Sequence, residues 1–121
     1  HLIYAGADII VVPSNYEPCG LTQMIGLRYG TVPVVRGVGG LVNTVFDRDY
    51  DTSHLPKERN GYVFYQSDYS AIESTLDRAI GLWYDYHDEF EKLVVQGMKC
   101  DNSWKYPAKD YVEIYDLIRH K

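Results

Sequence analysis

The sequence predicts an α/β fold in which a parallel sheet is flanked by helices, and three features of its first 35 residues predict it. Residues 8–12 read DIIVV and residues 32–35 read VPVV, two short runs of the kind that is buried on both faces of a parallel sheet. Between them LTQMIGLRY (21–29) carries apolar residues at helical spacings, and Gly30 suits the left-handed conformation that ends a helix. The unit is therefore strand, loop, helix, strand.

The remainder of the chain predicts further helices and one further strand. Asn60 and Gly61 form a turn signal before a third strand, and helical spacing of apolar residues predicts three amphipathic helices after it. To within about three residues, the expected strands are 9–12, 32–35 and 62–64, and the expected helices are 21–29, 71–84, 89–99 and 108–119. Shorter helical turns are expected at 2–7 and 41–45.

Start signals and apolar stripes accompany the later helices. Ser70 with Glu73 predicts a capping box, and Asp88 with Glu91 predicts a second cap. The positions expected to face inward are Ile72, Leu76, Ala79, Ile80 and Trp83, then Phe90, Leu93, Val94 and Met98. The last helix carries Ala108, Tyr111, Tyr115 and Ile118 on one side.

The segment 47–60 is polar, charged and interrupted by Pro56, which is typical of an exposed loop. Its residues Asp47, Asp49 and Asp51 could suggest a metal site, but DRDYD lacks the glycine and the terminal glutamate of a calcium loop. We therefore expect a solvated turn. The four histidines and two cysteines show no metal-type spacing and no disulfide framework, so we expect neither a metal nor a cofactor.

A candidate ligand site lies where the first strand ends and the next helix begins. Glu17, Cys19 and Gly20 are at this junction, and open α/β sheets bind ligands beyond the carboxyl ends of their strands. A helix start offers N–H groups without intrahelical partners and a partial positive charge, which suit a phosphate. Glu17 adds a carboxylate beside this anion site. That arrangement suits a reaction that develops positive charge, such as the oxocarbenium-like transition state of glycosyl transfer.

The residues around this junction resemble a known signature. EPCGLTQ (17–23), followed by RYGTVPVVR (28–36) and GGL (39–41), is similar to bacterial glycogen synthases and to plant and algal soluble starch synthases, glycosyltransferase family five. HLIYAGADIIVVPS, NTVFD, NGYVF and AIGLWYD extend the resemblance over most of the chain. It implies a retaining enzyme of the two-domain GT-B type, with residues 1–121 as part of the Rossmann-like C-terminal nucleotide-sugar-binding domain. Residues 101–121 would then be a terminal helix segment that packs toward the N-terminal domain, and the apolar side of this last helix is expected to be an exposed interface.

The resemblance also implies partners and roles. Enzymes of this family transfer glucose from ADP-glucose to the non-reducing end of an α-1,4-glucan. By resemblance, the Glu17 carboxylate lies near the transferred glucose, where it holds sugar hydroxyls and stabilises positive charge at the anomeric carbon. Gly20, Leu21 and Thr22 would present backbone N–H groups to the diphosphate, with the Thr22 hydroxyl as a further donor, and Cys19 would contact the sugar.

The segment RGVGGL (36–41) has two open interpretations. As a dinucleotide fingerprint it is weak, because it lacks the third glycine and no acidic residue ends a strand about 20 positions later. The backbone of Gly39 and Gly40 could instead flank the sugar or phosphate beside Gly20, which the resemblance supports. A turn that simply needs positive φ is the alternative.

One position departs from related retaining families, which carry a second glutamate eight positions after the first to bind the nucleotide ribose. Here that position is Ile25, and starch and glycogen synthases share the change. The family's lysine-glycine-glycine motif and its phosphate-binding Arg/Lys pair have no counterpart upstream of His1, and Arg28 and Arg36 do not match them. We therefore expect the chain alone to be inactive, although the enzyme that contains it is active.

Two other interpretations compete with this one. A different GT-B transferase, such as a sucrose- or trehalose-type synthase, is disfavoured by EPCGLTQ together with Ile25. A non-catalytic glucan-binding or scaffolding homologue is permitted by the 12 tyrosines, because tyrosine often covers surfaces that contact sugars or partners. Glu17 favours catalysis.

The overall composition excludes some partner classes. A net charge of −5 without any Lys/Arg cluster argues against binding to nucleic acid or to an anionic membrane. No apolar run approaches the roughly 20 residues that span a bilayer. By resemblance the compartment is a plastid, chloroplast or amyloplast, if the source is a plant or alga, and the cytoplasm if it is a bacterium.

Overall fold

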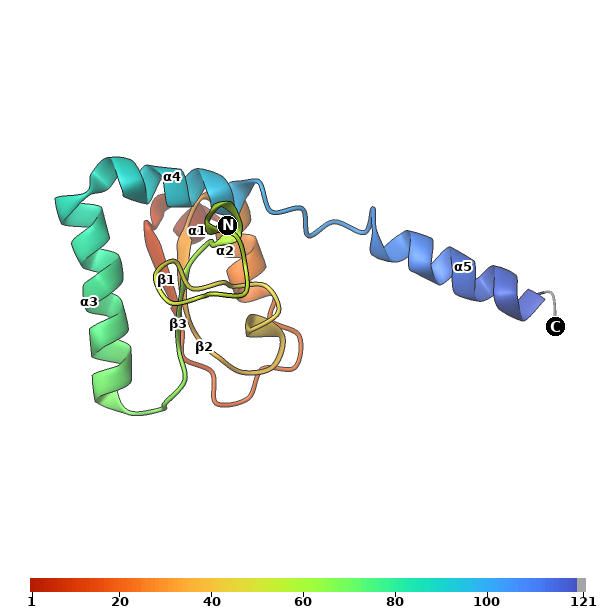
Figure 1. Ribbon diagram of the computed structural model, residues 1–121, viewed down its shortest axis with the longest axis horizontal. Helices are drawn as coiled ribbons and strands as arrows, with labels where there is room; N and C mark the ends of the chain where they lie inside the picture. Colours follow the sequence, from red (N-terminus) through yellow and green to blue (C-terminus); the bar gives the residue numbers. More distant parts are fainter. Residues whose placement is uncertain (120–121) are drawn as a thin grey trace.

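The computed structural model describes residues 1–119, which form a three-stranded parallel sheet flanked by helices (Figure 1). The predicted terminal segment 101–121 therefore ends in two residues that lie outside the described part. In chain order the elements are α1 (Leu2–Gly6), β1 (Ile9–Val12), α2 (Thr22–Tyr29), β2 (Val32–Arg36), η1 (Gly39–Leu41), η2 (Pro56–Glu58), β3 (Tyr62–Phe64), α3 (Tyr69–Asp85), α4 (His87–Met98) and α5 (Pro107–Arg119).

The sheet has the order β1-β2-β3, and both pairs of strands are parallel. Ile9 is opposite Val32, and Val34 is opposite Tyr62. The bounds of β1 and β3 are those predicted, and β2 continues one residue further, to Arg36. Because all three strands run the same way, the loops that follow them meet at one edge of the sheet (Figure 1).

Apolar side chains cover both faces of the sheet. Figure 1 shows α3 on one side of the strands and α2 on the other, with α4 across the end where the strands begin. The core under α3 and α4 contains Val32, Val34, Tyr62, Phe64, Ala79, Leu82, Phe90 and Leu93. The core on the opposite face contains Val12, Val35, Leu41 and Val45.

Helix α2 begins one residue later than predicted, with Leu21 as its N-cap. It ends at Gly30, whose φ of +84° is the left-handed conformation expected there. The Gly30 N–H donates to the Leu27 carbonyl at 3.1 Å, and the Thr31 N–H donates to the Gly26 carbonyl at 2.9 Å. This pair of bonds is a Schellman motif, and it turns the chain directly into β2.

The predicted capping box of α3 is wrong. The helix begins at Tyr69, and the carboxylate of Asp68 accepts a hydrogen bond from the Ala71 N–H at 2.8 Å. Ser70 therefore lies inside the first turn and does not cap with Glu73. An aspartate directly before the helix provides the acceptor that the serine was expected to provide.

The predicted side-chain cap of α4 is also wrong, because α4 follows α3 almost without a loop. The Tyr86 N–H donates to the Leu82 carbonyl at 3.1 Å, and the Tyr86 carbonyl accepts from the Phe90 N–H at 3.0 Å. The backbone of one residue thus closes one helix and opens the next. Asp88 lies within the first turn of α4, and no side chain caps that helix.

The inward-facing stripes are confirmed at most positions. Ala79, Phe90 and Leu93 are buried as predicted, but Ile80 and Met98 are 42% and 43% exposed. Leu82, which the helical spacing did not single out, is buried. The helical turn predicted at 41–45 is the 3₁₀ turn η1, followed by a turn in which the Val45 N–H donates to the Leu41 carbonyl at 3.0 Å.

The segment 47–60 is anchored at both ends by buried polar side chains, so the prediction of a solvated turn at Asp47 is wrong. Asp47 is 6% exposed and Asn60 is 1% exposed. The Asn60 side chain accepts from the Phe46 N–H and donates to the Thr44 carbonyl, each at 2.9 Å. Such bonds satisfy polar groups that burial would otherwise make costly, and they hold the loop against the sheet.

The Asp47 carboxylate forms an ion pair with Arg78 of α3. The two terminal guanidinium nitrogens, Nη1 and Nη2, donate to it, each at 3.0 Å, and Arg78 also lies over the Tyr62 ring at 5.0 Å. Burial alone would raise the pKa of Asp47, but hydrogen bonds from Arg78 and from backbone N–H groups outweigh it and hold this pKa below its ordinary value of 3.8. This ion pair joins the 47–60 loop to α3.

Helix α5 extends away from the body of the molecule (Figure 1). It begins one residue earlier than predicted, and none of its residues is buried. Its exposed apolar residues are Tyr111, Val112, Ile114, Tyr115, Leu117 and Ile118.

Candidate active site

Glu17, Cys19, Gly20 and Leu21 lie in the loop that leads from β1 to α2, at the edge of the sheet where the strands end (Figure 1). Of the other predicted site residues, Thr22 begins α2, and Gly39 and Gly40 lie in η1 after β2. Gly20 is buried and has a φ of +67°. A β-carbon at this position would lie 2.7 Å from the Gln23 Nε2 atom and 3.0 Å from the Gly40 backbone. The turn into α2 therefore requires glycine for both its conformation and its packing.

Glu17 is half-buried, and its carboxylate is held at both oxygens. Oε1 accepts from the Gly20 N–H at 3.0 Å, and Oε2 accepts from the Ser14 hydroxyl at 3.1 Å. Because a carboxylate has about four acceptor positions, two hydrogen bonds fix its orientation and leave acceptor capacity for another group. The side chain is thus positioned beside the start of α2.

Gly39 and Gly40 lie against the Glu17 loop. The Gly40 N–H donates to the Glu17 carbonyl at 3.2 Å. A β-carbon at Gly39 would overlap the Glu17 carbonyl, and one at Gly40 would overlap the Cys19 carbonyl. Gly39 also has a φ of +50°, so one of the two interpretations of RGVGGL, a turn with positive φ, is met by this residue.

The start of α2 gives the other predicted donors different surroundings. Leu21 is 60% exposed, Thr22 is half-buried, and Cys19 is an exposed free thiol. The N–H of Gly20, one of the three expected phosphate donors, already donates to Glu17. The backbone N–H groups of Leu21 and Thr22 are therefore the two expected phosphate donors that do not donate to Glu17.

The structure adds residues that sequence reasoning missed. Gln23 is fully buried in the first turn of α2, and its amide nitrogen donates to the Gly20 carbonyl and to the Thr44 hydroxyl. Arg36, the last residue of β2, donates through Nη1 to the Asn15 side chain at 2.9 Å. The available signals were a glutamine in the first turn of a helix and a cation at the carboxyl end of a strand.

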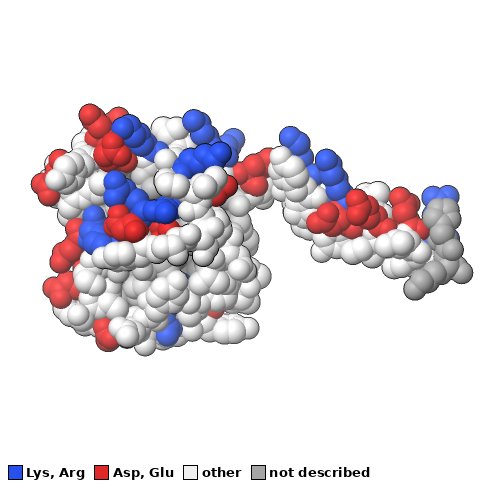
Figure 2. Space-filling view, viewed as in Figure 1, with Lys and Arg blue, Asp and Glu red and all other residues white. Residues whose placement is uncertain are grey.

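Figure 2 shows that charged side chains gather over the upper part of the body and along α5. The lower part of this view, toward which the strands point in Figure 1, carries few charges.

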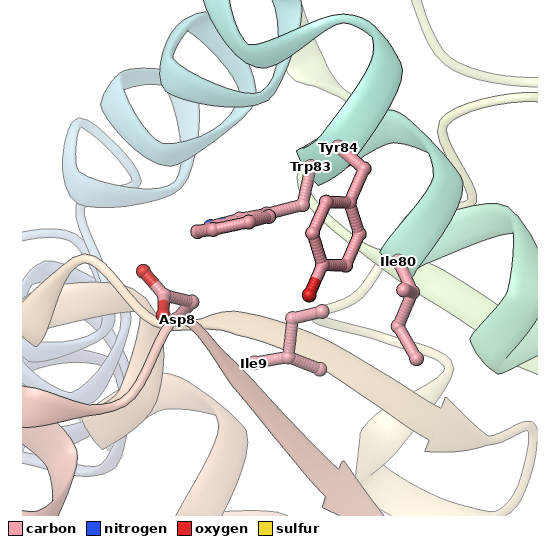
Figure 3. Close-up of a pocket in the computed structure, with 5 residues that line it drawn as sticks. All are labelled: Asp8, Ile9, Ile80, Trp83 and Tyr84. Carbon is pink, nitrogen blue, oxygen red and sulfur yellow. The ribbon is translucent and has the colours of Figure 1, made fainter.

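A cavity of about 420 Å³ lies elsewhere, at the end of the sheet where β1 begins. Figure 3 shows Trp83 and Tyr84 of α3 facing Asp8 and Ile9 across this space. None of the predicted site residues lines it. We place the candidate site at the Glu17 loop because the hydrogen-bonded carboxylate and the crossing glycine backbones are there.

The part of the chain that the structure describes contains no group of three histidine, cysteine, aspartate or glutamate residues arranged to hold a metal ion. Within residues 1–119, no helix combines the length and the apolar character that crossing a bilayer requires.

Comparison with curated proteins gives matches over the whole chain, although no family model matches it. It is 74% identical over 121 residues to glycogen synthase 1 of Synechococcus sp. (strain JA-3-3Ab) and 69% identical to glycogen synthase 1 of Trichormus variabilis. Each alignment covers 100% of this chain and 25% of the relative. The chain thus spans about a quarter of the length of the curated relatives that it matches.

Solved structures also give a match to a glucan synthase. The catalytic domain of starch synthase IV from Arabidopsis thaliana matches 95% of this chain with a TM-score of 0.89 and 39% identity, and the match covers 23% of that protein. Sucrose-phosphate synthase from Thermosynechococcus elongatus matches with a TM-score of 0.72 at 24% identity, which shows a shared fold. These comparisons confirm the resemblance found in the sequence and the GT-B fold class.

Proposed function

Because the chain matches glycogen synthases over its full length and a starch synthase in fold, we propose that it is the nucleotide-sugar-binding part of a retaining glucosyltransferase. The reaction would transfer glucose from ADP-glucose to the non-reducing end of an α-1,4-glucan. The bond from the anomeric carbon to the diphosphate breaks, a bond to the acceptor's hydroxyl oxygen forms, and the leaving phosphate accepts the hydroxyl proton.

One observation carries the proposal: the Glu17 carboxylate is fixed beside the start of α2, where a phosphate would bind. A fixed negative charge next to an anion site would weaken simple nucleotide binding. The same carboxylate stabilises the transition state when positive charge develops at a sugar carbon that lies between the carboxylate and the phosphate. We therefore assign Glu17 to the transferred glucose, where its free acceptor positions hold hydroxyl groups.

The diphosphate would contact the first backbone N–H groups of α2. Leu21 and Thr22 provide two of these groups, and the Thr22 hydroxyl adds a side-chain donor. Gly20 contributes mainly the positive φ that turns the chain into α2, because its N–H donates to Glu17 and because Gln23 and Gly40 fill the space beside it. Gly39 and Gly40 would flank the sugar or phosphate on the other side, and the exposed Cys19 would contact the sugar.

The name of the matched starch synthase supports the choice of donor. That catalytic domain was solved bound to ADP and acarbose, and ADP is the product that our proposed donor would leave behind. The curated relatives named here are bacterial glycogen synthases, which favours the bacterial cytoplasm and gives the plastid expectation no support.

The remaining partners are proposed from the share of the relatives that the chain spans. We propose that residues 1–121 are part of a C-terminal domain, that an N-terminal domain of the same polypeptide completes the site, and that 101–121 packs toward it. The exposed apolar residues of α5 are consistent with such packing. The 121-residue chain alone is then expected to show no transfer activity.

The test is Glu17→Ala in the full-length enzyme, with steady-state kinetics and ADP inhibition measured side by side. We expect kcat to fall by roughly a hundredfold or more, as when a charge that stabilises a transition state is removed. The inhibition constant of ADP should change by less than about threefold, because Glu17 is assigned to the sugar.

Glu58→Gln is the matched control. Its carboxylate also accepts from a backbone N–H three residues earlier, that of Leu55 at 2.9 Å, but it lies in η2 within the 47–60 loop. It should retain wild-type kinetics. Full turnover in Glu17→Ala would show that catalysis does not need Glu17, and absence of turnover in the wild-type full-length protein would favour the scaffolding interpretation. An equal loss of ADP affinity would move Glu17 from the sugar to the diphosphate.

A further inference from the structure

Five hydrogen bonds form a closed circuit through the Glu17 loop. The Gly20 N–H donates to the Glu17 carboxylate, and the Gly40 N–H donates to the Glu17 carbonyl. The Gly20 carbonyl accepts from the Gln23 amide, which also donates to the Thr44 hydroxyl at 2.7 Å. Thr44 in turn donates to the Gly40 carbonyl at 3.1 Å, which returns the circuit to its start.

Gln23 is the side chain that closes this circuit. It is fully buried, whereas Glu17 is only half-buried and open to ligand. Its orientation is determined, because both of its partners are reached through the amide nitrogen and the Gly20 carbonyl can only accept. The amide oxygen has no hydrogen-bond partner among the described residues, so the side chain is buried at a cost that its two donated bonds must offset.

We infer that Gln23 is a positioning residue that fixes the Glu17 carboxylate through Gly20, a role that rests on the proposed function of Glu17. Holding the Gly20 carbonyl fixes the Gly20 peptide, and its N–H then fixes one carboxylate oxygen. The bond to Thr44 locks the same side chain to the loop that contains Gly40. Both sides of the sugar site are therefore held by one buried amide.

The kinetic test uses the full-length enzyme with Gln23→Leu, which keeps the size of the side chain and removes its donors. We expect kcat to fall about tenfold to a hundredfold, with the KM for ADP-glucose changed less than about threefold, because misplacing a catalytic group acts mainly on the transition state. Thr44→Val should show a smaller loss of kcat, and Thr44→Ser, which restores the hydroxyl, should return close to wild type.

A double variant shows whether Gln23 acts through Glu17. In a Glu17→Ala background, Gln23→Leu should lower kcat by less than about twofold further, since the group that it positions is gone. The same loss in both backgrounds would overturn the inference. A folded Gln23→Leu enzyme with wild-type kcat would also overturn the inference. If Glu17→Ala still showed its large loss of kcat in that case, the proposed function would stand.

Hydrogen exchange provides a readout that does not depend on activity. The Gly20 and Gly40 N–H groups should exchange faster in Gln23→Leu, because both bonds belong to the circuit. Thr75→Val is the control: it removes another buried hydroxyl, which donates to the Ala71 carbonyl at 2.8 Å within α3. It should leave both glycine amides unchanged. Unchanged exchange in Gln23→Leu, or equal acceleration in Thr75→Val, would contradict the positioning role.

Discussion

Replacing Arg78 with methionine should destabilise the region around β3, because it leaves the Asp47 carboxylate buried without its charged partner. That carboxylate also accepts from the N–H groups of Asp49, Tyr50 and Val63 at 2.7 to 3.0 Å. Removing one member of a fully buried ion pair costs about 3–5 kcal/mol. The Asp47 side chain is 8% exposed and that of Arg78 is 20% exposed, so water reaches part of the pair. We therefore expect a loss near the lower end, about 3 kcal/mol.

Native-state hydrogen exchange at the Val63 N–H measures this loss, since that group donates to Asp47 from within β3. A loss of about 3 kcal/mol corresponds to protection about a hundredfold weaker. Arg48→Met is the matched control, because Arg48 pairs with Asp49 at 2.7 Å at the surface, where such pairs contribute about 0–1 kcal/mol. Protection of Val63 that is unchanged in Arg78→Met, or that falls equally in Arg48→Met, would refute this account of the pair.

The remaining predictions concern pH and the start of α2. Because the pKa of Asp47 is lowered on folding, the unfolded chain binds the proton first as the pH falls, and the stabilisation present above about pH 4 should be lost as the pH drops through the folded pKa. Urea denaturation between about pH 3 and 6 should show this decline in the wild type and a shallower one in Asp47→Asn. In the full-length enzyme, Gly20→Val should impair ADP-glucose use far more than Thr22→Val, because the first change strains a positive φ and the second removes one hydroxyl, at a cost of roughly 1 kcal/mol or less. Steady-state kinetics compares the two variants once circular dichroism shows that both fold. Neither substitution should change co-sedimentation of the enzyme with glucan. Wild-type kinetics in both variants would exclude a phosphate site at the start of α2.

The strands and most helices could be predicted because their signals are local. The run DIIVV ends where β1 ends, and Gly30 marks the end of α2 through a backbone conformation that glycine adopts readily. The position of the candidate site was likewise predictable, since a glutamate and a glycine between a strand and the helix that follows it lie at the carboxyl edge of a parallel sheet.

What the sequence did not reveal depends on partners that are distant along the chain. Asp47 was expected to be solvated because its neighbours are charged, and its partner Arg78 is 31 residues away. Gln23 looked like an ordinary helix residue, and its partner Thr44 is 21 residues away. A pattern of single residues cannot indicate such pairings before the fold brings them together.

The contact between the two glycine-containing loops has a consequence for protein engineering. Gly39 and Gly40 meet the carbonyl groups of Glu17 and Cys19 with no room for a β-carbon, so the backbones interlock. A graft that moved only EPCGLTQ into another α/β scaffold would lack the Gly39–Gly40 segment against which this loop packs. Transplanting the chemistry would require residues 37–44 as a second graft in the same register, and random mutagenesis should find few tolerated changes at Gly39 and Gly40, because the atoms that they meet are backbone carbonyls that no substitution removes.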